Sequence, residues 1–212
     1  MRFTLLAGGP GNGHTMRCNV LALELESRGH EVHSNAKIAI VDPGAERFSI
    51  AEFTHVIGLD SGDHPDVNYD IVTGFDKCLI PGDVLSADTT QRGAYTFVAP
   101  YFDLSGDGYF RAANLSRVDY VSAMAGAESC VTNGGLTMLE AMSMGKRVWV
   151  IPRSPSEFAF ALRALDMGAI CGIGCEVPPS CDWADTSPTA RTVVARDGAQ
   201  LVADEILEVI GV

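Results

Sequence analysis

Short apolar segments alternate with glycine-rich or polar turns along the first half of the chain. Residues 3–7 form an apolar segment that runs into a glycine-rich turn, and Met16, Val20 and Leu23 follow with helical spacing. Gly29 stands where this helix should end, because glycine tolerates the positive φ of that position. A strand, a turn, a helix and a second strand in this order are typical of a parallel α/β sheet. The pattern predicts a helix over 15–28 and strands over 3–7, 31–33, 38–41, 55–59 and 70–73.

The same order of strand, glycine turn and helix returns after residue 115. Between the two regions, residues 78–107 carry many turn formers and no helical periodicity, so we place a domain crossover there. We therefore expect an α/β protein with two Rossmann-like halves, 1–95 and 96–212, the second ending in a polar linker and a terminal helix. Its predicted helices cover 118–125, a stretch that ends at 145, 157–167 and 197–209, and its predicted strands cover 129–132, 147–151 and 169–171.

Composition and charge narrow the class of protein. The 212 residues are 47% apolar and 20% charged, which is typical of a globular protein with a buried core. The net charge of -12 excludes a general nucleic-acid or anionic-membrane binder, because both partners favour a basic surface. The apolar segment at 3–7 is too short for a membrane span or an export signal, so we expect a cytoplasmic protein.

Six cysteines are scattered through the chain, and without an export signal we expect free thiols rather than disulfides. Only Cys171, Cys175 and Cys181 lie close together in the sequence. Their spacing fits no standard zinc pattern and no histidine lies nearby, so we expect no metal site.

The first glycine turn ends at His14, beside the predicted start of a helix. The turn lacks the Gly-Lys-Ser/Thr sequence of a P-loop and the glycine spacing of dinucleotide-binding folds. The positive end of a helix disfavours an imidazolium ion, so we expect His14 to be neutral and able to accept a proton. His14 is therefore a candidate general base; the alternative is that it only caps the helix and hydrogen-bonds the turn.

The second glycine turn follows the predicted strand 129–132 and leads into Thr137 and Glu140. These two residues have the spacing of a capping box, which gives Glu140 a purely structural role. In the functional alternative, Gly134, Gly135 and Thr137 hold a diphosphate on the helix N-terminus. Glu140 then accepts hydrogen bonds from two ribose hydroxyls, since a carboxylate offers two acceptor oxygens in one plane.

Both turns resemble motifs of one enzyme family. The sequence from Gly11 through Gly13 and His14 to Arg17, with Arg28-Gly-His-Glu-Val32 after it, is similar to the opening of GT-B-fold nucleotide-sugar enzymes. Within that fold it most resembles the UDP-sugar hydrolase of pseudaminic acid biosynthesis and its spore-coat polysaccharide relatives. The sequence from Gly134 to Glu140, followed by Gly145 and the segment ending in Ile151-Pro152, resembles the UDP-binding segment of that family and of MurG-type glycosyltransferases.

The resemblance implies a set of roles for these residues. His14 would activate water for attack at the anomeric carbon, and Glu140 would bind the ribose. The remaining substrate- and nucleotide-binding residues would be Gly11, Gly13, Arg17, Asn133, Gly134, Gly135 and Thr137. No cofactor is implied.

The chain also departs from the family. Relatives run well beyond 300 residues, whereas here we expect the second half to be shortened by a strand-helix-strand-helix block between about 103 and 118. The family often places a glutamine after the loop at Pro152, where this chain has Glu157.

Three functions follow from these observations. The first is hydrolysis of a UDP-sugar with His14 as the base, and the second is inverting glycosyl transfer from the same donor to an acceptor hydroxyl. Both use one base and one leaving-group pocket, in a cleft that we expect between the two halves. The third is a non-catalytic nucleotide-sugar-binding subunit, in which a second copy or another chain covers a sheet edge exposed by the shortening.

Overall fold

The computed structural model describes residues 1–7, 13–42, 49, 52–59, 67–73, 79–194 and 197–212. The chain forms two compact units. Unit 1 comprises Met1–Pro81 and Ala195–Val212, and unit 2 comprises Gly82–Val194. These limits differ from the expected halves of 1–95 and 96–212, because the chain changes unit earlier and its last helix returns to the first unit.

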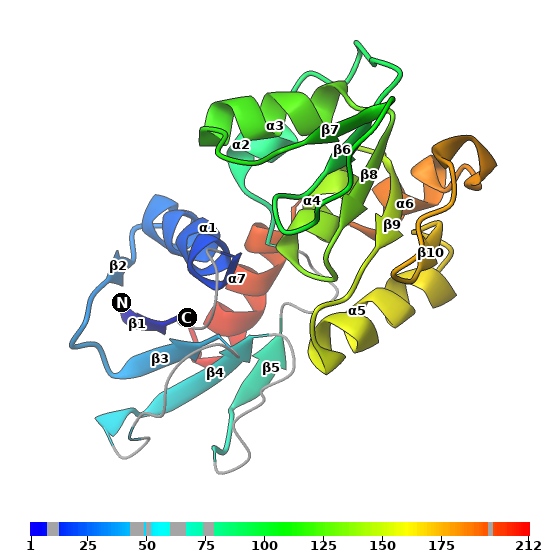
Figure 1. Ribbon diagram of the computed structural model, residues 1–212. Helices are drawn as coiled ribbons and strands as arrows, with labels where there is room; N and C mark the ends of the chain where they lie inside the picture. The colour runs from blue at the N-terminus through cyan, green and yellow to red at the C-terminus, as the bar shows by residue number, and fades with distance from the viewer. Residues whose placement is uncertain (8–12, 43–48, 50–51, 60–66, 74–78, 195–196) are drawn as a thin grey trace. The chain divides into compact units, whose positions relative to one another are not determined.

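Unit 1 is a five-stranded parallel sheet in the order β2-β1-β3-β4-β5 (Figure 1). Its strands are β1 (Arg2–Leu6), β2 (Glu31–Val32), β3 (Ile38–Val41), β4 (His55–Leu59) and β5 (Ile71–Thr73). All five predicted strands of the first half are therefore confirmed to within one residue at each end. Its helices are α1 (Gly13–Ser27) and α7 (Gly198–Val209), which contact each other.

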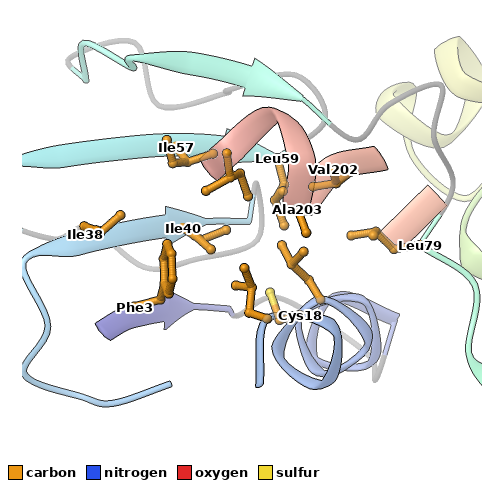
Figure 2. Packing of buried hydrophobic residues seen from close by; sticks show 12 residues of the cluster. Phe3, Cys18, Ile38, Ile40, Ile57, Leu59, Leu79, Val202 and Ala203 are labelled. Atoms are coloured by element: carbon orange, nitrogen blue, oxygen red, sulfur yellow. The ribbon is translucent and has the colours of Figure 1, made fainter. Parts of the chain in front are cut away.

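The core of unit 1 lies between one face of this sheet and the two helices. Strand alternation directs Ile38 and Ile40 to this face, while Ala39 and Val41 belong to a smaller apolar cluster. Figure 2 shows the side chains from β1, β3 and β4 pointing toward Cys18 of α1 and toward α7. The fully buried members of this core include Phe3, Leu21, Leu25, Ile40, Ile57, Leu59, Val202, Ala203 and Ile206.

Unit 2 is a second five-stranded parallel sheet, in the order β10-β9-β8-β6-β7, with helices packed on it. Its strands are β6 (Thr96–Val98), β7 (Tyr109–Arg111), β8 (Ser129–Thr132), β9 (Arg147–Val150) and β10 (Gly172–Ile173). Its helices are α2 (Gly82–Leu85), α3 (Arg117–Gly126), α4 (Leu136–Ser143), α5 (Pro155–Asp166) and α6 (Ser187–Val193), with a short 3₁₀ segment at Ser180–Asp182. The predicted α/β class, with two Rossmann-like layouts, is therefore confirmed.

Five elements of unit 2 differ from the sequence prediction. α2 and β6 lie inside the segment 78–107, where only a crossover was expected, and β7 lies just beyond it. Strands of three residues are too short to show a period, although Phe97 and Val98 are fully buried. α6 occupies part of the predicted polar linker, and the strand expected at 169–171 lies at β10 instead. Among the residues that the structure describes, every helix is too short or too polar to span a lipid bilayer.

Candidate functional site

His14 lies in the first turn of α1, which begins after the carboxyl end of β1. Its Nδ1 shares a short hydrogen bond with Oδ1 of Asp42. A carboxylate only accepts, so Nδ1 carries a proton, and in the neutral ring the lone pair is then on Nε2. The His14 side chain is 31% exposed, whereas that of Asp42 is fully buried. This arrangement orients an imidazole that can take a proton through Nε2.

Asp42 follows β3, and parallel pairing brings it to the start of α1. The register matches Leu6 of β1 with Val41 of β3, and the Asp42 amide donates to the Leu6 carbonyl oxygen at 2.9 Å. The carboxyl ends of β1 and β3 therefore lie at the same edge of the sheet. This is the edge where ligands bind in open α/β folds. Asp42 was not predicted from the sequence. Its signal was an acid placed directly after the wholly apolar strand 38–41.

Arg17, expected to bind substrate, also reaches Asp42. Its Nη2 donates to Asp42 Oδ2 at 2.6 Å, one helical turn after His14. The two oxygens of one buried carboxylate thus hold His14 and Arg17 side by side. Gly13 is the first residue of α1. Gly11 lies outside the described residues.

The second glycine turn connects β8 to α4 in unit 2. Gly135 is the N-cap of α4, and no side chain caps the helix. Thr137 instead lies within the helix and accepts a hydrogen bond from the Tyr120 hydroxyl at 3.1 Å. The capping-box alternative for Thr137 and Glu140 is therefore wrong, because α4 begins before Thr137. Within the described part of the chain, the amides of Gly134 and Gly135 donate to no protein acceptor.

The turn itself packs against the start of α5. A Cβ atom on Gly134 would lie 2.1 Å from the Glu157 carbonyl oxygen, so only glycine fits there. Asn133 Nδ2 donates to Glu157 Oε1 at 2.7 Å, and the Arg153 amide donates to Glu157 Oε2 at 2.6 Å. Glu157, which stands where the resembling family has glutamine, is thus bound to the turn by its side chain.

Two polar atoms beside this turn are buried without a hydrogen-bond partner. They are the Thr132 hydroxyl oxygen and Oδ1 of Asn133. Strand alternation places Thr132 on the same face of the sheet as Cys130, which is opposite to Val131. Buried polar groups rarely lack a partner, so these two atoms are exceptions that lie together beside one helix N-terminus.

Glu140 is the buried acid of this region, with a residue exposure of 2%. Arg117 Nη2 donates to its Oε1 at 2.8 Å, and the same guanidinium binds both oxygens of Asp83 at 2.8 and 3.1 Å. Burial raises the pKa of Glu140, and the Arg117 charge opposes that rise. The hydrogen bond from Arg117 lowers the pKa of Asp83. A ribose would reach Glu140 only by sharing the carboxylate with Arg117.

Cysteine, histidine and acidic side chains are the residues that could bind a metal ion. Cys171 and Cys175 are free thiols, and the Cys171 thiol contacts the Ala184 carbonyl oxygen at 3.2 Å. In the ranges that the structure covers, no three His, Cys, Asp or Glu side chains converge on a common point.

No protein-family model matches the chain, and no curated protein matches it at a significant level.

Proposed function

We propose that the protein is a GT-B-type enzyme that hydrolyses a nucleotide-diphosphate sugar, with a UDP-sugar as the favoured substrate. The observation that carries the proposal is the pair of His14 and the buried Asp42 at the carboxyl edge of the unit 1 sheet. A histidine that is oriented by a buried carboxylate is a common general base, because the carboxylate fixes the tautomer and stabilises the imidazolium that forms.

In the proposed reaction, Nε2 of His14 removes a proton from water while the water oxygen attacks the anomeric carbon. The bond between that carbon and the diphosphate oxygen breaks, and the electron pair leaves with the nucleoside diphosphate. The products are the free sugar, the nucleoside diphosphate and one proton, which His14 then releases to solvent. Asp42 and Arg17 act by holding the ring in place rather than by touching the substrate.

Unit 2 supplies the proposed nucleotide site. The amides of Gly134 and Gly135 and the positive end of α4 suit the charge that develops on a departing diphosphate. Glu140 is the proposed ribose ligand, and Arg117 holds its carboxylate in position. The preference for UDP rests on the resemblance of the segment from Gly134 to Glu140.

The test is turnover of UDP-, GDP-, CMP- and TDP-sugars by the full chain in ¹⁸O-labelled water. Hydrolysis predicts release of the nucleotide together with a free sugar that carries one ¹⁸O atom at its anomeric carbon. The His14→Gln variant should lose this activity, whereas His33→Gln, an exposed histidine of the same unit, should keep it.

Other outcomes separate the alternatives. Sugar release that requires an added hydroxyl acceptor would replace hydrolysis by glycosyl transfer at the same site. Nucleotide binding without turnover would favour a binding subunit that needs a partner chain. Full activity in His14→Gln would remove the proposed base.

A further inference from the structure

Unit 1 contains a cavity of about 430 Å³ at the opposite edge of its sheet from His14. The cavity is formed where β1, β3 and β4 begin, beside the residue that follows α7. Because the strands are parallel, their amino ends meet at this edge and their carboxyl ends meet at the other. Its polar and apolar lining includes Arg2, Asn35, Lys37, Thr54, His55 and Ile210. The volume falls in the range of small-molecule sites, roughly 300–1,000 Å³.

The charge of the lining is opposite to that of the protein. The chain carries 27 acidic and 15 basic residues, yet among the described residues the cavity lining includes the cations Arg2 and Lys37 and no acid. Two cations at one cavity of an acidic protein create a local positive potential that attracts small anions.

The cationic groups keep hydrogen-bonding capacity for a ligand. The Lys37 amine donates to the Glu52 carbonyl oxygen at 3.0 Å, which uses one of its three protons. Arg2 binds Glu31 through Nε at 2.8 Å, and its two terminal nitrogens make no ion pair with an acid in the described residues. Thr54 is held beside Lys37 because its amide and hydroxyl both donate to the Lys37 carbonyl oxygen, at 2.7 and 3.1 Å.

His55 also lines the cavity. Its Nδ1 is buried, makes no hydrogen bond and lies 3.5 Å from Oδ2 of Asp70, which accepts the Val56 amide at 2.7 Å.

We propose that this cavity binds an oxyanion, the phosphate or carboxylate group of a small metabolite, through Arg2, Lys37 and His55. Charge-assisted hydrogen bonds from a guanidinium and an ammonium suit both oxyanions, and Thr54 and Asn35 supply further polar contacts. The site is separate from His14, so it stands whether or not the proposed hydrolysis does.

The experiment is an NMR titration of the ¹⁵N-labelled full chain with inorganic phosphate in one series and succinate in the other. Sodium chloride at equal ionic strength serves as the control series. Saturable shifts are expected for amides of residues 36–38 and 54–56 with at least one of the two oxyanions. The series that saturates at lower concentration identifies the class of ligand group.

Variants test which residues bind. Lys37→Gln and Arg2→Gln should each raise the Kd by about tenfold, because each removes a charged donor. Arg111→Gln removes the same charge from unit 2 and should leave the Kd unchanged. Dispersed amide spectra verify that each variant is folded. The proposal fails if neither oxyanion gives saturable shifts at these amides, or if both lining variants bind as the wild type does.

Discussion

Arg117 links Glu140, buried within α4, to Asp83, in the first turn of α2. It donates to Glu140 at 2.8 Å and to both oxygens of Asp83, while its Cζ lies over the Tyr120 ring, 5.7 Å from the ring centroid. The Arg117 side chain is 33% exposed, whereas the Glu140 side chain is 2% exposed. Arg117 therefore compensates the charge of Glu140, and Asp83 is a second acidic partner of the same guanidinium.

Replacing Arg117 by methionine should destabilise unit 2 by about 3 kcal/mol, because it leaves the Glu140 carboxylate buried without a counter-charge. The double variant Arg117→Met with Glu140→Leu should regain most of this loss, since neither charge then remains inside. Urea unfolding followed by tryptophan fluorescence measures the effect, because the two tryptophans of the chain, Trp149 and Trp183, both lie in unit 2. Equal stability of the single and double variants would contradict the coupling.

Replacing Asp42 by asparagine should lower kcat for the proposed hydrolysis by about 10² or more, with little change in KM. Asparagine can donate as well as accept, so it no longer fixes the Nδ1–H tautomer of His14 or stabilises its protonated form. The measurement is steady-state kinetics with the nucleotide sugar that the turnover experiment identifies as the substrate. Asp204→Asn, an exposed acid of the same unit, is the matched control and should retain the wild-type kcat. A fall confined to KM would mean that Asp42 only shapes binding.

Gly134→Ala should destabilise unit 2 by roughly 1–3 kcal/mol, because the new methyl would lie 2.1 Å from the Glu157 backbone oxygen. Gly135→Ala is the matched control. Its Cβ would lie 3.1 Å from Asn133 Nδ2, the end of a side chain that can move, and we expect a smaller cost. Tryptophan fluorescence during urea unfolding again reports the difference. Equal costs at the two glycines would show that α5 moves aside easily.

The central strands of unit 1 were predictable because polar or turn-forming residues flank their apolar segments. β3 and β4 were predicted with their observed bounds, because 38–41 is wholly apolar and 55–59 is largely apolar. The sheet on which α7 packs was not predictable from the sequence. Its buried side chains, Val202, Ala203 and Ile206, form an apolar stripe that would fit either sheet, and only the packing in Figure 2 assigns it to unit 1.

The candidate site was predictable only in part. His14 and Glu140 were found from local motifs, because each stands near a glycine turn at a helix start. Their partners were not, since Asp42 is 28 residues from His14 and Arg117 is 23 residues from Glu140. Such pairs depend on strand register and helix packing, which a local pattern does not contain. The capping-box alternative failed for a local reason, because α4 begins at Leu136 and Thr137 lies within it.

Lys146 should make the stability of unit 2 rise with pH just above neutrality. Its side chain is fully buried, and the amine donates to the carbonyl oxygens of Ala125 and Ala127 at the end of α3. Burial lowers the pKa of Lys146 from 10.5 to about 8. Between these two values the unfolded chain binds more protons than the folded chain, so the contribution of Lys146 to stability increases as pH rises through this window. Below pH 8 both states are protonated and the contribution is constant.

Cys130 acts in the opposite direction at higher pH. Burial raises the pKa of its thiol from 9.0 to about 12, so the unfolded chain loses this proton first and stability falls above pH 9. The comparison is therefore made between pH 8 and 9, against Lys146→Met, which keeps Cys130. From pH 8 to 9, the free energy of unfolding of the wild type should rise by about 1 kcal/mol relative to that of the variant. A difference between the two proteins that stays constant from pH 7.5 to 9 would show that the buried amine keeps its proton throughout.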